Sequence, residues 1–490
     1  MSEAAASVPF SETKAPESAD RLHRGALGLV DISASTMANI GPAYSFYFSA
    51  GFLFLTAGIA APLTIIVAGV AIALLGNTLS QFSRAHPSTG GFISFVGKTF
   101  GGSSAVTTAL LCGAGYIIAI SSVLAICGGY LSMLLNYYFS WNVPWVIFSV
   151  IFTAGAMVMM YRGVAVSTKL AGLFFGFELL VLVVVSVAAL IKNGGHLSPM
   201  PFEPSHITNG FSGLAAGFPL AVYLFIGWEN SAALAEETNN PRRNVPRAVY
   251  MSIALMAVGY VLYAYATATG FKYNVTALNS AVIPFINVSH DIAAWLAGFA
   301  WLAGLTSTLG VLIAAVNSQA RLIFNAGREG LLPRWLGKVH PTRRTPVNAM
   351  FTFIAIAAVI ILVWALLHLA GGAKQSGEMN ALNYFVDSST MGTILVLVVY
   401  FLANLALPFY YRKYRPQEFN VLKHAVLPVL GMIAVGVPMY YLVKPGQAAP
   451  LNWFPYAALG VIVVSVGYAV WASRRDPGLG DRVGSIVADE

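Results

Sequence analysis

The sequence predicts an all-α polytopic membrane protein, and three observations support this fold class. Hydrophobic residues make up 57% of the 490 residues and charged residues only 9%, and the mean hydropathy is +0.72. These values lie far outside the range of soluble globular proteins. Apolar runs of about 20 residues, the length that spans a bilayer as a helix, recur along the chain. Basic residues also concentrate in alternate loops, as they do in proteins that cross a membrane many times.

The apolar runs predict 12 transmembrane helices, arranged as two sets of five and a final pair. The first set is expected at residues 27–52, 57–82, 104–136, 142–160 and 166–192. The second set is expected at 209–236, 247–271, 292–327, 347–370 and 382–410, and the final pair at 424–443 and 453–473. The expected regions are therefore a tail at 1–25, a first repeat at 26–192, a second repeat at 205–411, helices 11 and 12 within 424–473, and a tail at 474–490. The first tail is rich in Ser, Ala and Glu without an apolar core, which predicts disorder rather than a signal peptide.

Lys and Arg residues lie mainly on one side of this topology. If the first helix starts in the cytoplasm, only Lys192, Lys272, Lys374 and Lys444 of the 27 Lys and Arg residues fall in outside loops. By the positive-inside rule both termini are then cytoplasmic. We expect an integral protein of the cytoplasmic membrane, with a bacterial host as the working assumption and membrane lipid as its surroundings. The net charge of +8 follows from this topology, and its dispersal over short loops argues against a nucleic-acid partner.

Two predicted helices carry breaks in corresponding positions. In the first helix Gly41-Pro42 removes an amide donor near the middle of the membrane. In the sixth helix the run from Phe225 to Glu229 contains a Gly and a carboxylate at the same depth. Either break alone is also compatible with a kink that neighbouring helices accommodate. Breaks in the first helix of both five-helix halves predict a five-plus-five inverted repeat, discontinuous helices 1 and 6, and a transported solute between them.

Three segments resemble the amino acid–polyamine–organocation superfamily of permeases. His86 to Gly101 (HPSTGGFISFVGKTFG) is similar to the family's Pro-x-x-Gly-Gly segment after helix 2. Glu236 to Ala248 (EETNNPRRNVPRA) resembles the loop after helix 6, and Arg321 to Pro346 resembles the end of helix 8 with its loop. With the matching helix spacing, the resemblance covers residues 26 to 473. It implies the fold of the bacterial leucine transporter and transport by alternating access.

The resemblance also implies that unwound backbone in helices 1 and 6 binds the substrate. The matching residues are Asn39, Ile40, Gly41, Pro42 and Ala43 in helix 1, and Tyr223, Phe225, Ile226, Gly227 and Trp228 in helix 6. Amides of the helix 1 group are expected to hold a carboxylate, although Pro42 lacks one. Carbonyls of the helix 6 group are expected to accept bonds from an ammonium. Tyr223 aligns with a gating aromatic of the family's amino acid antiporters, and the alternative for Tyr223 and Trp228 is a packing role.

Several polar residues inside predicted helices are candidates for coupling or gating. Glu178 lies deep in apolar helix 5, where burial favours the protonated carboxyl and suits proton coupling. Glu229 is assigned to coupling or gating, with a structural hydrogen bond as the alternative. Sodium coupling is the alternative to protons, through hydroxyls of helix 8; these belong to Thr306, Ser307 and Thr308. Asp31 is expected to cap helix 1 or to pair with a basic residue such as Arg321.

Together these features predict a secondary active transporter of amino acids that works by alternating access and is coupled to protons. The alternatives are a polyamine or organic amine permease, an amino acid exchanger, and a receptor that binds amino acids without transport. No nucleophile–base pair, phosphate-binding Gly loop or metal-ligand spacing is recognisable, so we expect neither an enzyme nor a cofactor. A pocket without Lys or Arg should disfavour purely anionic substrates, and Pro42 decides between amino acids and amines. The oligomeric state is not predicted.

Overall fold

The computed structural model describes residues 22, 25–162, 164–370, 381–447, 449–484 and 488. Helices make up the regular structure of these residues, and no strand is found among them apart from an isolated bridge between Leu27 and Thr238. The predicted all-α fold is confirmed. The predicted disordered tail at 1–25 lies outside the described residues except at positions 22 and 25, and residues 485–487, 489 and 490 lie outside them as well.

The helices follow the chain order expected from the apolar runs. They are α1 (Leu29–Ile40), α2 (Pro42–Ala57), α3 (Ala61–Ala85), α4 (Phe92–Phe100), α5 (Gly102–Phe139), α6 (Trp145–Tyr161), α7 (Val164–Lys192), α8 (Gly210–Tyr223), α9 (Asn230–Ala233), α10 (Pro241–Gly270), α11 (Val275–Ser280), α12 (Pro284–Ile292), α13 (Ala294–Arg328), α14 (Val347–Ala370), α15 (Ala381–Tyr414), α16 (Leu427–Val443), α17 (Phe454–Arg475) and α18 (Leu479–Arg482). Short 3-10 turns and a π-helical turn at Leu422–Val426 join some of them.

The helix lengths agree with an integral membrane protein. Among the described residues, nine stretches are long and apolar enough to cross a membrane. One of them, Leu29–Ala85, is 57 residues long, which is enough for two crossings of about 20 residues each. Two shorter apolar helices, α6 with 17 residues and α8 with 14, complete the set. This arrangement is consistent with the 12 predicted crossings.

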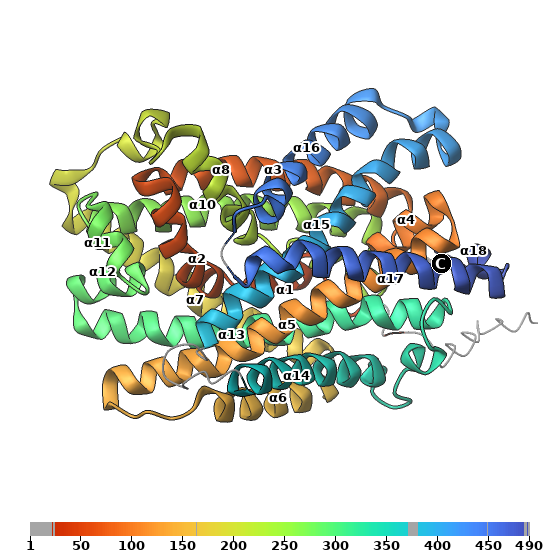
Figure 1. The fold of residues 1–490 in the computed structure, drawn as a ribbon, viewed down its shortest axis with the longest axis horizontal. Helices are drawn as coiled ribbons and strands as arrows, with labels where there is room; N and C mark the ends of the chain where they lie inside the picture. The colour runs from red at the N-terminus through yellow and green to blue at the C-terminus, as the bar shows by residue number, and fades with distance from the viewer. Residues whose placement is uncertain are drawn as a thin grey trace, which may run out of the picture.

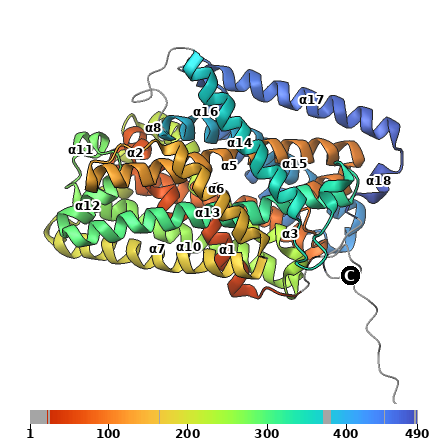
Figure 2. The same cartoon turned by 90° about the horizontal axis from the view of Figure 1, so that it is seen from below.

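The helices run roughly along the long axis of the molecule (Figure 1). At one end lie α11 and α12, and at the other lie α18 and the C-terminus (Figure 1). We call the first end the far face, and the second, which also holds residues 25–27, the terminal face. The last two long helices, α16 and α17, are mostly exposed, and Figure 2 shows α17 along the rim of the bundle.

The two predicted breaks are present. Gly41 separates α1 from α2 with a φ of +62°, and a Cβ there would lie 2.1 Å from a methyl group of Val311. Helix 6 ends as α8 at Tyr223 and resumes as α9 at Asn230, with Gly227 between them at a φ of +106°. Both Gly positions combine a left-handed backbone with a close neighbour, which only Gly accommodates easily. Discontinuous helices 1 and 6 are therefore confirmed, whereas the inverted repeat stays a prediction.

Buried ion pairs close the terminal face. Arg321 on α13 bonds Glu237 at 2.6 Å, and each side chain is only 1% exposed. Two turns further along α13, Arg328 bonds Glu236 at 2.6 Å. Both carboxylates follow the break in helix 6, so the pairs join α13 to the segment just after α9. Asp31 caps α1, the first of the two roles expected for it, and Arg321 pairs with Glu237 instead.

The C-terminal segment docks on the same face. The amide of Gly484 donates to Glu329 Oε1 at 3.0 Å, and Arg482 Nε donates to the Glu329 carbonyl at 3.2 Å. The amide of Ala488 donates to the carbonyl of Pro87 at 2.9 Å. Glu329 directly follows α13, so the segment covers the end of the helix that carries both ion-pairing arginines.

This docking should weaken as the pH rises from about 5 to about 8. Burial raises the pKa of the Glu329 carboxyl to about 7 from 4.5. The docked state therefore binds a proton that the undocked state releases, so docking is strongest below the ordinary pKa and is lost progressively up to about 7. Hydrogen exchange of amides 476–484, corrected for the intrinsic rate at each pH, should be at least about tenfold faster at the higher pH.

Glu329→Gln should remove this pH dependence, because the amide side chain keeps the acceptor oxygen and does not ionise. Glu203→Gln, on the far face, serves as the control and should behave as the unmodified protein. Equal protection of the segment at both pH values in the unmodified protein would contradict the prediction.

Candidate functional site

The two helix breaks touch one another in the middle of the bundle. Asn39 Nδ2, at the end of α1, donates to the carbonyl of Gly227 at 3.3 Å. A cavity of about 40 Å³ lies beside this contact and is lined by both breaks. A water molecule needs about 10–15 Å³ by this measure, so the cavity has room for a few waters. We call it the central cavity. In this conformation it is too small to hold an amino acid.

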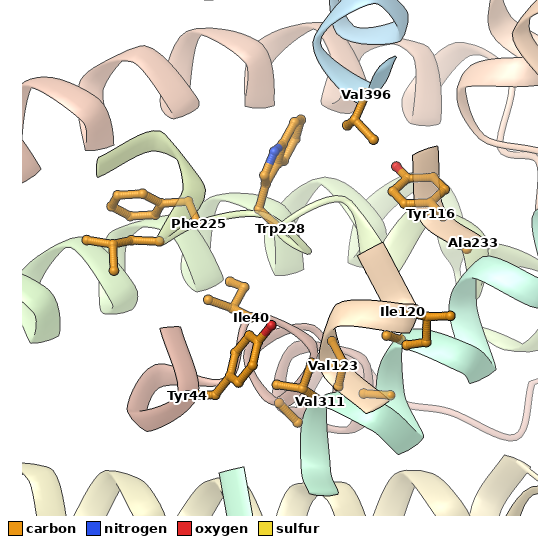
Figure 3. Packing of buried hydrophobic residues seen from close by; sticks show 14 of the residues in the cluster. Ile40, Tyr44, Tyr116, Ile120, Val123, Phe225, Trp228, Ala233, Val311 and Val396 are labelled. Carbon is orange, nitrogen blue, oxygen red and sulfur yellow. The ribbon is translucent and has the colours of Figure 1, made fainter. Parts of the chain in front are cut away.

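The wall of the central cavity is largely apolar. Ile120 and Val123 from α5, Val311 from α13 and Val396 from α15 line it, and Figure 3 shows Val396 apart from the other three. The polar side chains of the wall come from all the surrounding helices: Asn39, Tyr44, Ser45, Tyr116, Tyr223, Gln319 and Thr393. Such a wall, apolar with a few convergent polar groups, is typical of a small-molecule site.

The amides at the start of α2 already have partners or do not exist. Gly41 N donates to the carbonyl of Met37 within its own turn, and Pro42 has no N–H. Ala43 N donates to Glu178 Oε2 at 3.0 Å. Glu178, on α7, is fully buried, and its second oxygen has no hydrogen-bond partner among the described residues. The segment predicted to hold a substrate carboxylate is therefore occupied by a carboxylate of the protein itself.

The three hydroxyl residues considered for sodium differ in placement. Ser307 Oγ accepts from Tyr44 N at 2.9 Å and so contacts the break of helix 1. Thr306 donates to carbonyls of its own helix, and Thr308 donates to that of Leu305 at 2.9 Å. Of these three residues, Ser307 hydrogen-bonds the backbone at the helix 1 break, whereas the two Thr hydroxyls bond their own helix, and the sodium site stays a prediction.

The predicted helix 6 residues divide into two groups. Tyr223, Ile226 and Gly227 line the central cavity. The rings of Phe225 and Trp228 are fully buried and pack against aromatics, with centroids 5.5 Å from Tyr260 and 5.6 Å from Tyr400. Figure 3 shows Trp228 on one side of the unwound chain, with Ile40 and Tyr44 on the other. Their side chains thus have packing partners, the alternative role expected for Trp228.

Aromatic side chains close the central cavity toward the far face. The hydroxyls of Tyr44 and Tyr223 lie 3.2 Å apart in a hydrogen bond. The ring of Phe385 packs edge-on against both, at 5.7 and 5.8 Å. Beyond them lies a larger cavity of about 510 Å³ that shares Tyr223 and Thr393 with the central cavity. Tyr223 therefore stands between the two spaces, which supports the gating role predicted for it.

Glu229 joins the break of helix 6 to α5. Its Oε1 accepts from the Tyr116 hydroxyl at 2.8 Å, and its Oε2 accepts from Gly227 N at 3.2 Å. It lines a second, smaller cavity toward the terminal face, which we call the inner cavity. The structural hydrogen bond expected as one alternative is present, and a part in coupling stays a prediction.

Among the polar residues of the wall, sequence reasoning missed Tyr44, Ser45, Tyr116, Gln319 and Thr393. Gln319 could have been found from the sequence, because an uncharged polar residue inside a predicted membrane helix is unusual. It lies on α13, seven residues before Ala326 of the family segment. The tyrosines carried no such signal, since Tyr is common in membrane helices and at their ends. Only the approach of α5 to the break of helix 6 reveals the partner of Tyr116.

The sequence profile described as amino acid permease matches residues 27–467. The chain belongs to this family. The permease is 23% identical over 439 residues to the branched-chain amino acid permease BcaP of Bacillus subtilis, which covers 83% of the permease and 85% of BcaP. It is 24% identical over 429 residues to the methylthioribose transporter of the same organism, with coverage of 83% and 85%. The mouse Asc-type amino acid transporter 1 is 26% identical over 356 residues, covering 69% of the permease and 64% of that transporter.

A solved structure shares the fold. A manganese transporter of Eremococcus coleocola superposes with a TM-score of 0.57 at 10% sequence identity, covering 90% of the permease and 94% of the transporter. This likeness concerns the fold alone. The recognition of the permease superfamily from three sequence segments is confirmed.

Gly227→Ala should disrupt the site. The new Cβ would lie 2.8 Å from Asn39 Nδ2 and 3.1 Å from the Asn39 carbonyl oxygen, at a φ of +106° that disfavours Ala. The contact between the breaks must therefore separate. We expect the affinity of the purified permease for its transported solute to fall at least about tenfold, a loss of about 1.4 kcal/mol.

Gly176→Ala is the matched control, since Gly176 lies in α7 with no neighbouring atom within 4 Å of a Cβ. It should leave both affinity and melting temperature unchanged. A Gly227→Ala permease that binds with the affinity of the unmodified protein would show that the contact between the breaks does not shape the site.

Proposed function

We propose that the permease is a secondary active transporter that carries amino acids with uncharged, apolar side chains across the bacterial cytoplasmic membrane together with protons. The observation that carries the proposal is the central cavity, which lies at the contact of the two helix breaks and has an apolar wall. The positive-inside pattern assigns the terminal face to the cytoplasm. The far face is then the outside.

The wall chemistry favours an apolar substrate side chain. Ile120, Val123, Val311 and Val396 offer branched aliphatic surface, and each CH₂ group buried against such surface contributes about 0.8 kcal/mol. An ionised side chain in the same place would lose its hydration without compensation. Because BcaP and the methylthioribose transporter are similar to the permease at almost the same level, overall similarity does not select the cargo, and the cavity is the better guide.

The position of Glu178 supports proton coupling. Its carboxyl accepts a hydrogen bond from the Ala43 amide. A substrate carboxylate bound at the helix 1 break would use the same amide. Two carboxylates competing for one amide repel each other while both are charged. A proton on Glu178 weakens it as an acceptor and removes this repulsion, so the substrate carboxylate and the proton favour each other's binding. That reciprocity is the thermodynamic requirement for symport.

The closures on both faces support alternating access. Tyr44, Tyr223 and Phe385 close the outer side of the central cavity. The pairs Arg321–Glu237 and Arg328–Glu236 close the inner side. A transporter of this type opens the two sides in turn around a fixed site, and a state closed on both sides is the intermediate that this cycle requires.

Uptake into liposomes that contain the purified permease tests coupling. An inward proton gradient should drive accumulation of labelled leucine or valine, and Glu178→Gln should abolish accumulation while leaving exchange against internal substrate, because the neutral amide binds no proton. Glu418→Gln, at an exposed side chain, is the control. Accumulation at the normal rate in Glu178→Gln, or driven by a sodium gradient alone, would contradict proton coupling. Binding without any flux would favour the receptor alternative, and exchange alone the exchanger.

Substrate class is tested by competition and by filling the apolar wall. Unlabelled leucine, isoleucine and valine should compete well, whereas lysine, glutamate and putrescine should compete at least about tenfold less well, given the cost of burying a charge. Val123→Phe should exclude leucine and retain alanine, because it fills the space of the larger side chain. Val158→Phe, at a 54% exposed site on α6, should change neither. Strong competition by putrescine would favour the amine permease.

A further inference from the structure

We infer that Gln319 accepts a hydrogen bond from the amino group of the substrate at the passage between the central and inner cavities. The inference rests on the proposed function, because it deepens the description of the same site. It assigns substrate binding to a side chain of α13, whereas the expected substrate contacts come from the backbone of helices 1 and 6.

The passage is defined by three shared residues. Asn39, Tyr116 and Gln319 line both the central cavity and the inner cavity. They come from α1, α5 and α13, so the passage lies where three helices meet beside the contact between the breaks. These three side chains therefore stand between the central cavity and the inner cavity.

Two of the three side chains are already engaged with helix 6. Asn39 Nδ2 donates to the Gly227 carbonyl, and the Tyr116 hydroxyl donates to Glu229. Gln319 differs, since its Oε1 has no hydrogen-bond partner among the described residues although the side chain is only 8% exposed. A buried acceptor without a partner is uncommon in folded proteins and calls for an explanation.

The missing group is a donor, and the substrate amine supplies one. A primary ammonium carries three N–H groups and no acceptor. Gln319 and Gly227 both line the central cavity, and Gln319 Oε1 and the Gly227 carbonyl are both acceptors. A neutral amide suits this place, because it binds an ammonium without adding a charge that the substrate would leave behind unpaired when it departs.

The neighbouring residue supplies a matched comparison. Ser318 also lines the inner cavity, but its hydroxyl donates to the carbonyl of Ala315 in the same helix at 3.1 Å. Its polar group is therefore satisfied without a ligand. Ser318→Ala removes a hydroxyl from the same turn of α13 and leaves the acceptor of Gln319 in place.

Competition against labelled leucine in liposomes tests the inference, with leucine and its deaminated analogue 4-methylpentanoate as competitors. Gln319→Met should weaken inhibition by leucine at least about tenfold and that by the analogue less than about twofold, since a hydrogen bond to a charged group is worth about this much. Gln319→Glu keeps an acceptor and should retain the preference for the amine. Ser318→Ala should behave as the unmodified permease.

Each outcome has a distinct meaning. An equal loss for both competitors in Gln319→Met, or an unchanged preference for leucine, overturns the inference even when the unmodified permease transports leucine. A lower melting temperature with the preference intact would do the same, because it assigns Gln319 to stability. Failure of the unmodified permease to bind or transport any amino acid would instead overturn the proposed function, and the inference with it.

Discussion

The structure depends on how backbone groups freed by two helix breaks are satisfied inside a membrane. Bilayer hydrocarbon offers no hydrogen bonds, so each free amide or carbonyl must find a partner in the protein. Glu178 and Ser307 take the amides of Ala43 and Tyr44, while Asn39 and Glu229 take the carbonyl and amide of Gly227. The breaks thus persist because side chains of α7 and α13, of the opposing break and of the helix 6 break itself replace the lost helical bonds. Of these side chains, Asn39 also lines the central cavity and Glu229 lines the inner cavity, so groups that stabilise the breaks also border the two cavities.

The closures on the two faces differ in physical character, and this difference bears on how each opens. On the far face, neutral aromatic rings and one hydroxyl pair separate the central cavity from the larger space beyond. On the terminal face, Arg321 and Glu237 are paired with almost no exposure. Separating a buried ion pair without rehydration leaves an uncompensated charge, at a cost of about 3–5 kcal/mol. In the proposed alternating-access cycle, opening of this side therefore requires water to reach these residues as they part, which would couple the movement of helix 6 and α13 to hydration of the terminal face.

Much of the fold was predictable because its determinants are local. Apolar run length locates the helices, and Gly41-Pro42 and Gly227 mark the breaks, since chain geometry alone disfavours a continuous helix there. The partners of the breaks were not predictable, because they depend on how helices approach one another. Arg321 illustrates this: Asp31 was a reasonable partner by sequence, but it caps its own helix, and Glu237 reaches Arg321 only once helix 6 has unwound. Tyr116 was missed for the same reason, because its bond to Glu229 depends on how α5 approaches helix 6.

Pro42 and Glu178 together change what the first break does. In a helix start with several free amides, an anionic group binds whatever the protonation state of its surroundings. Here Pro42 has no amide and Glu178 holds that of Ala43, so a substrate carboxylate gains a donor only by displacing a protein carboxyl. Displacement is unfavourable against an ionised Glu178 and easier against a protonated one, because protonation weakens the acceptor and removes the repulsion between like charges. Under the proposed proton coupling, the amide missing at Pro42 therefore makes substrate affinity depend on a proton bound to Glu178 on a neighbouring helix.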